Sequence, residues 1–131
     1  TNNRSQVIEK GANTIIMDAY NANPSSMKAA IENFKNVDVN TRILILGDMF
    51  ELGNDSIHYH QEIINYLEKI NDSIIYIVGE YFCNTKHSDK IKSFSSKKEL
   101  INNLSKTNVS NYSILIKGSR GMQLEKIIEF I

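Results

Sequence analysis

The sequence has few of the features that mark several large classes of protein. Its 131 residues include one cysteine, Cys83, which excludes an internal disulfide framework and a zinc site built from cysteines. Fifteen Lys and Arg residues balance 15 Asp and Glu residues, which argues against a nucleic-acid partner bound through excess basic side chains. Apolar runs reach only about five residues, whereas a membrane-spanning helix needs about 20.

The composition gives no sign of a boundary between domains. Proline occurs once, and we find no linker, internal repeat or low-complexity segment. At 41% hydrophobic residues, a chain of this length can bury one core without covalent staples. We therefore expect a single domain over residues 1–131. The sequence begins at Thr1 rather than Met and shows no secretory leader, so we expect a cytoplasmic enzyme or part of a longer one.

Short apolar runs rich in β-branched residues recur along the chain. Runs of this kind are typical of strands that are covered on both faces, as in a parallel sheet between helices. The pair Val7 and Ile8 is expected to form a hairpin with the first of these strands, and the weaker run at 91–94 is expected near an edge. The predicted core strands are 14–17, 43–46, 74–78 and 114–116.

Segments with helical spacing separate the predicted strands. Asn23 can cap the first helix, and Pro24 suits its first position, where an N–H is not needed. The alternation predicts an α/β fold, a Rossmann-like doubly wound, mostly parallel sheet of about five to six strands flanked by helices. The four apolar stripes are Met27, Ala30, Ile31 and Phe34; His60, Ile63, Ile64 and Leu67; Leu100, Ile101 and Leu104; and Leu124, Ile127, Ile128 and Ile131.

Polar residues follow the predicted strands, at the ends where open α/β sheets bind ligands. The Asp18 carboxylate suits sugar hydroxyls of a nucleotide, although Asp at such a place also serves as an N-cap or in an Asx-turn. Asn21 and Asn23 carry the same two interpretations. Asp48 and Glu51 suit an ammonium group or a metal-bound water, and a solvated loop is the alternative.

The segment after the last predicted strand suits an anion. Gly118 and Gly121 let the backbone approach a ligand closely, while Lys117, Ser119 and Arg120 add two positive charges and a hydroxyl. The combination fits a carboxylate or a phosphate. It fits equally a plain turn whose cations lie in solvent, and the two interpretations stay open at this point.

A complete catalytic set is missing from the sequence. We find no Gly-x-x-x-x-Gly-Lys-Ser/Thr phosphate loop, no Gly-x-Gly-x-x-Gly after a strand and no Gly-x-Ser-x-Gly motif. His58 and His60 are two positions apart on a predicted helix, so they point in different directions and do not form a metal site. We expect no catalytic residue and no metal ligand in this chain.

Three blocks of sequence, taken together and in order, resemble the C-terminal domain of the Mur ligases. Within that family the resemblance is to the members that add D-alanyl-D-alanine to UDP-MurNAc-tripeptide. It covers essentially the whole chain. The blocks are DAYNANP at 18–24 followed by Ser26 and Met27, LGDMFELG at 46–53, and KGSR at 117–120; Arg4, Ser56 and His60 also match family positions.

The resemblance implies an ATP-dependent ligase that forms a C–N peptide bond during peptidoglycan precursor synthesis. ATP would convert the tripeptide carboxylate into an acyl phosphate, and the amine of D-Ala-D-Ala would then displace phosphate. ATP and Mg²⁺ would be held mainly by a central domain, and the UDP-sugar by an N-terminal domain, neither of which this sequence contains. The chain alone is expected to be inactive. The implied nucleotide-side residues are Arg4, Asp18, Tyr20, Asn21 and Asn23, and the implied dipeptide-side residues are Asp48, Lys117, Ser119 and Arg120.

Two alternatives remain at this point. One is the C-terminal domain of another Mur-type or folylpolyglutamate-type ligase, which shares the architecture. The other is a non-enzymatic α/β nucleotide-binding module, such as a receiver-like domain, although a receiver needs paired acidic residues that are absent near Asp18. Under the ligase interpretation, Asp18→Ala is expected to weaken ATP use while the fold is retained.

Overall fold

Six strands form one sheet in the order β1-β2-β6-β3-β4-β5 in the computed structural model, which describes residues 5–18, 21–37 and 41–131. Strands β2 to β6 pair in parallel, and β1 runs antiparallel to β2. The predicted α/β class, the N-terminal hairpin and the edge position of the weak fifth strand are all confirmed. The strands are β1 (Gln6–Lys10), β2 (Asn13–Asp18), β3 (Arg42–Gly47), β4 (Ser73–Val78), β5 (Ile91–Phe94) and β6 (Ser113–Lys117).

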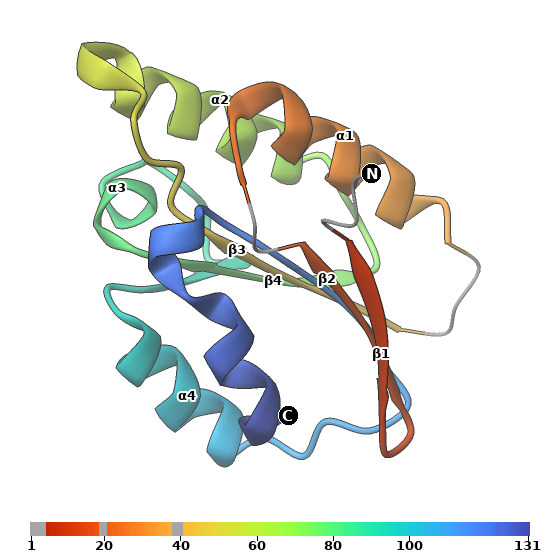
Figure 1. Ribbon diagram of the computed structural model, residues 1–131. Helices are drawn as coiled ribbons and strands as arrows, with labels where there is room; N and C mark the ends of the chain where they lie inside the picture. Colours follow the sequence, from red (N-terminus) through yellow and green to blue (C-terminus); the bar gives the residue numbers. More distant parts are fainter. Residues whose placement is uncertain (1–4, 19–20, 38–40) are drawn as a thin grey trace.

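Helices cover both faces of the sheet. α1 and α2 lie together on one face, and α4 and the C-terminal helical segment lie on the other (Figure 1). The helices are α1 (Pro24–Lys35), α2 (Ser56–Leu67), α3 (Glu80–Cys83) and α4 (Lys97–Ser105), with 3₁₀ segments η1 (Gly53–Asp55), η2 (Arg120–Met122) and η3 (Leu124–Phe130).

Alternation along the central strands explains why their sequences are continuously apolar. Leu44 and Leu46 of β3 pack in the cluster beneath α1 and α2. Ile43 and Ile45 pack in the cluster beneath α4 and η3. Successive side chains of a strand point to opposite faces, so a strand covered on both sides needs apolar residues at every position.

The predicted start of α1 is confirmed. The Asn23 side chain accepts a hydrogen bond from the Ser26 N–H at 2.8 Å, and the Ser26 hydroxyl accepts one from the Asn23 N–H at 3.0 Å. This reciprocal pair is a capping box, with Pro24 at the first helical position.

The C-terminal segment differs from the α-helix that its apolar spacing predicts. Residues Leu124–Phe130 form a 3₁₀-helix. Side chains three positions apart eclipse one another in a 3₁₀-helix, and this aligns Leu124 with Ile127, both fully buried against the sheet. Along the described ranges, no helix has the length and apolar character needed to cross a membrane.

Candidate functional site

The carboxyl ends of the parallel strands bring the predicted polar residues to one edge of the sheet. Asp18 of β2 and Leu46 of β3 both pair in register with Lys117 of β6. Asp48 follows directly after β3, so it lies at the same edge. The structure therefore brings Asp18, Asp48 and Lys117 together along one rim, as the α/β interpretation requires.

Lys117 and Asp18 form an ion pair that is largely buried. The Lys117 ammonium donates to the Asp18 carboxylate at 2.8 Å and to the Asn21 carbonyl oxygen at 3.0 Å. The exposed fraction of the side chain is 2% for Lys117 and 16% for Asp18. The interpretation in which the cation of Lys117 lies in solvent is therefore wrong. Its charge instead fixes the end of β2 to the loop at Asn21.

Asp48 is also buried, and its carboxylate caps α3. One oxygen accepts from the Tyr81 N–H and the other from the Phe82 N–H, each at 2.9 Å. Burial raises the pKa of the Asp48 carboxyl, and the hydrogen bonds from Phe82 and Tyr81 oppose that increase. Gly79 makes the arrangement possible, because its φ is +125° and an added Cβ would lie 2.3 Å from the carboxylate. The solvated-loop alternative is wrong for Asp48.

The backbone after β3 is joined at two residues, Asp48 and Phe50, to Ser119 in the loop after β6. The Ser119 N–H donates to the Asp48 carbonyl oxygen at 3.0 Å. The Phe50 N–H donates to the Ser119 hydroxyl oxygen at 2.8 Å. Sequence blocks that lie far apart in the chain therefore form one bonded unit at the edge.

His60 of α2 is completely buried and contacts the loop that follows β3. Its Nδ1 lies 2.7 Å from the Ser56 carbonyl oxygen, which can only accept, so Nδ1 carries the proton. Nε2 is then an acceptor, and it receives the Met49 N–H at 3.0 Å. Burial lowers the pKa of His60, in keeping with a neutral ring. Sequence analysis missed this role, although His60 stood within an apolar stripe.

Two shallow depressions open at this edge, and Phe50 and Gly121 line both. A Cβ on Gly121 would lie 2.9 Å from the Phe50 ring, so the glycine lets the ring sit against the loop. The depression of about 390 Å³ extends from Asp48 and Tyr81 toward the start of α4. The other, of about 360 Å³, is lined by Asn21, Phe50, Glu51, Ser119, Arg120 and Gly121, and we call it the Arg120 depression.

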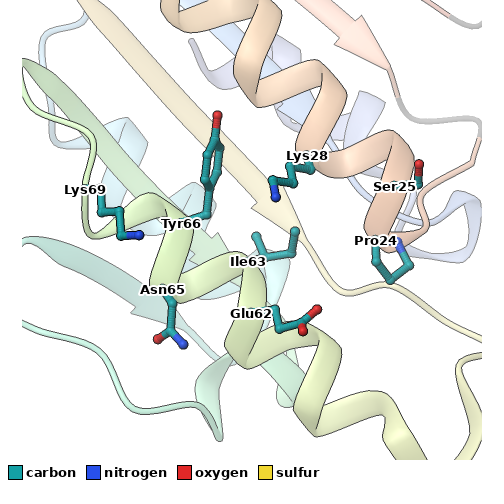
Figure 2. Close-up of a pocket in the computed structure, with 8 residues that line it drawn as sticks. All are labelled: Pro24, Ser25, Lys28, Glu62, Ile63, Asn65, Tyr66 and Lys69. Atoms are coloured by element: carbon teal, nitrogen blue, oxygen red, sulfur yellow. The ribbon is translucent and has the colours of Figure 1, made fainter.

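A separate groove of about 440 Å³ lies between α1 and α2 and shares no lining residue with these two depressions (Figure 2). The Tyr66 ring stands between the helices, with the Lys28 ammonium 5.4 Å from its centre, and the Tyr66 hydroxyl donates to Glu32. None of the predicted site residues lines this groove.

The described ranges contain no group of three or more His, Cys, Asp or Glu side chains that could hold a metal ion. Two predicted nucleotide-side residues, Arg4 and Tyr20, lie outside the residues that the structure describes.

Comparison with protein families identifies the family of this chain. The family described as "Mur ligase, glutamate ligase domain" matches residues 3–120. The chain belongs to the Mur ligase family. It corresponds to the C-terminal domain of these ligases, as the three sequence blocks predicted.

Two curated relatives of this chain carry the same name. The chain is 39% identical over 139 residues to the UDP-N-acetylmuramoyl-tripeptide–D-alanyl-D-alanine ligase of Rickettsia prowazekii, covering 99% of this chain and 30% of that protein. The Bacillus subtilis enzyme of the same name is 34% identical over 124 residues, covering 88% of this chain and 27% of that protein. The chain thus spans less than a third of the length of these Mur ligases.

Solved structures of Mur ligases share the fold. A crystal structure of MurF from Acinetobacter baumannii superimposes with a TM-score of 0.84 at 29% identity, covering 98% of this chain and 29% of that one. MurF from Thermotoga maritima in complex with ADP gives a TM-score of 0.77 at 26% identity, covering 97% and 30%.

Proposed function

We propose that this chain is the C-terminal domain of a cytoplasmic, ATP-dependent ligase that joins D-Ala-D-Ala to UDP-MurNAc-tripeptide for peptidoglycan precursors. The observation that carries the proposal is the 39% identity across 99% of the chain to a ligase named for this reaction. The absence of a phosphate loop from the sequence fits a domain that completes a site begun by other domains.

In this reaction, ATP phosphorylates the tripeptide carboxylate, and the amine of D-Ala-D-Ala attacks the acyl phosphate with release of phosphate. An acyl phosphate is readily hydrolysed, so the site must exclude water before the amine attacks. A domain whose binding groups all lie at one edge can do this by closing over ligands held by the rest of the enzyme. The chain's own residues therefore bind and orient the reactants.

We assign Asp18, Asn21 and Asn23 to the nucleotide side of the edge. Arg4 and Tyr20 stay nucleotide-side residues on the sequence resemblance alone. We assign Asp18 to the ribose of ATP, since an acidic residue at a strand end accepts hydrogen bonds from sugar hydroxyls. The Lys117 ammonium holds its carboxylate in place. Asn23 Oδ1 is committed to the helix cap, so its contribution is to position the loop.

The dipeptide side is the Arg120 depression. The Ser119 hydroxyl accepts from the Phe50 N–H and can donate its own proton to a carboxylate. Arg120 lines the same depression, and the charge of its guanidinium group suits the dipeptide carboxylate. Lys117 and Asp48 are buried, so we assign them to holding the loops around this depression rather than to direct contact.

ATP and Mg²⁺ are the proposed cosubstrate and metal, held mainly by the central domain. The described residues of this chain offer no cluster of metal ligands, so we assign none of them to Mg²⁺.

The test is ATP-dependent phosphate release by the full-length enzyme, supplied with UDP-MurNAc-tripeptide and D-Ala-D-Ala, L-glutamate or a diamino acid. Of these three amines, we expect only D-Ala-D-Ala to support turnover with UDP-MurNAc-tripeptide. Preference for glutamate or a diamino acid would replace the proposal with another ligase of the family. Nucleotide binding without turnover of any amine would indicate a non-enzymatic module. The isolated chain should release no phosphate.

A further inference from the structure

His60 has a contact that core packing alone does not require. Its ring is fully buried among the residues of α2 and α3, packing edge-to-face on Phe82 with centroids 4.7 Å apart. A phenylalanine could supply this packing. A phenylalanine could not accept the Met49 N–H, which would then be buried without a partner.

The tautomer of the His60 ring determines which of its nitrogens can accept a hydrogen bond from the loop. The Ser56 carbonyl oxygen accepts a hydrogen bond from Nδ1–H, and this leaves the lone pair of Nε2 directed at the Met49 N–H. Asp48 Oδ1 lies 3.9 Å from Nε2, beyond hydrogen-bond distance. The neutral ring therefore acts as a fixed acceptor rather than as half of an ion pair.

Met49 directly precedes Phe50, whose ring lines the Arg120 depression. The Met49 N–H is held by His60 of α2 and the Phe50 N–H by Ser119 after β6, so two consecutive amides are anchored by different elements. A second connection runs through Tyr81, whose ring lies 5.3 Å from His60 and 6.5 Å from Phe50 between centroids. Both connections end at the same wall of the depression.

We propose that His60 is a positioning residue for the Arg120 depression: its neutral Nε2 holds the Met49 N–H and thereby fixes Phe50 against Ser119 and Gly121. The inference rests on the proposed function only for the identity of the ligand, D-Ala-D-Ala. Loss of the acceptor should loosen this wall while the nucleotide side, held by Lys117 and Asp18, stays in place.

Two substitutions in the full-length enzyme separate the acceptor from the rest of the side chain. His60→Gln extends its amide oxygen to about the place of Nε2 and can still accept from Met49. His60→Asn is shorter, and its amide can donate to the Ser56 carbonyl oxygen but does not reach Met49. Ile64→Val is the matched control, because Ile64 is fully buried in the same helix and makes no contact with the loop through a polar atom.

We expect His60→Asn to raise the KM for D-Ala-D-Ala about tenfold, the factor that corresponds to one lost hydrogen bond, with the KM for ATP within about twofold. His60→Gln should restore most of the loss, and Ile64→Val should leave both KM values unchanged. The proposal would be overturned if the KM for D-Ala-D-Ala were equal in His60→Asn and the wild type, or if His60→Gln did not restore it. A KM for ATP that rises as much as that for the dipeptide would also overturn it.

Hydrogen exchange of the Met49 amide in the same proteins gives a readout that does not depend on the substrate. We expect slow exchange in the wild type and in His60→Gln, and exchange at least about tenfold faster in His60→Asn. Fast exchange in the wild type would contradict the positioning role. If another amine proves to be the substrate while exchange behaves as expected, the proposed function fails and the role of His60 stands, with the KM split then measured for that amine.

Discussion

Removal of the Asp18 carboxylate should destabilise the whole domain, because it leaves the Lys117 ammonium buried without a counter-charge. The two groups are 2.8 Å apart, and their side chains are 2% and 16% exposed. Breaking a buried ion pair by removing one partner costs about 3–5 kcal/mol. The partial exposure of Asp18, and the bond that Lys117 keeps to the Asn21 carbonyl oxygen, place Asp18→Ala at the lower end, about 3 kcal/mol.

In a domain of 131 residues, that loss corresponds to a fall of about 10 °C in Tm. The sequence alone predicted that Asp18→Ala would weaken ATP use with the fold retained. The buried ion pair adds a cost in stability that the sequence did not reveal. Measurements of ATP use in this variant therefore need a parallel measurement of its stability.

The assay is a double-mutant cycle of Asp18→Ala, Lys117→Met and the double variant, followed by urea and thermal unfolding. Lys117→Met should cost less than Asp18→Ala, because the remaining carboxylate is the more exposed partner. The loss in free energy of unfolding in the double variant should be about 2 kcal/mol smaller than the sum of the losses in the two single variants. Additive losses, or an Asp18→Ala variant within about 2 °C of the wild type, would refute the buried-pair reasoning.

Two further predictions concern the support beneath the edge. Gly79→Ala should cost about 3 kcal/mol or more, because its Cβ would lie 2.3 Å from the Asp48 carboxylate at a φ of +125°. Gly11→Ala, with a φ of +60° and nothing within 4 Å, should cost only about 1 kcal/mol in the same urea titration, and equal losses would contradict the clash. Burial lowers the pKa of His60 below its usual value of 6.5. As the pH falls, the unfolded chain therefore binds a proton at His60 before the folded chain does. The free energy of unfolding should therefore fall as the pH drops from about 7 to about 5, and His60→Gln should remove that part of the slope. Asp48 acts in the opposite sense, since burial raises its pKa above 3.8 and its protonation in the folded state offsets some of the loss at lower pH. A wild-type curve no steeper than that of His60→Gln over this range would contradict the assignment of a neutral His60.

The sheet could be predicted because its strands carry their own signal. Strands covered on both faces are apolar at consecutive positions, and residues 43–46 of β3 and 114–116 of β6 show this in sequence and in burial. The start of α1 was equally clear, because Asn23 and Pro24 act on neighbouring residues. The helix type of Leu124–Phe130 could not be predicted from the sequence. Apolar side chains three positions apart suit both an α-helix and a 3₁₀-helix, and packing decides between them.

The roles of the buried polar residues could not be predicted, because their partners are distant in the chain. Asp48 caps a helix whose amides lie 33 and 34 residues further on. Lys117 and Asp18 are 99 residues apart and meet only because β6 inserts beside β2. Sequence showed which residues gather at the edge. The strand order determines which of them are buried and hold the loops in place.

We propose that one edge of this domain receives a dipeptide in the Arg120 depression and a nucleotide beside Asp18. The most direct test is a crystal structure of the full-length enzyme with a non-hydrolysable ATP analogue and D-Ala-D-Ala. We expect the dipeptide carboxylate within hydrogen-bond distance of Ser119 or Arg120, and the ribose hydroxyls at Asp18. A dipeptide bound in the groove between α1 and α2, or a nucleotide away from this edge of the sheet, would contradict the account.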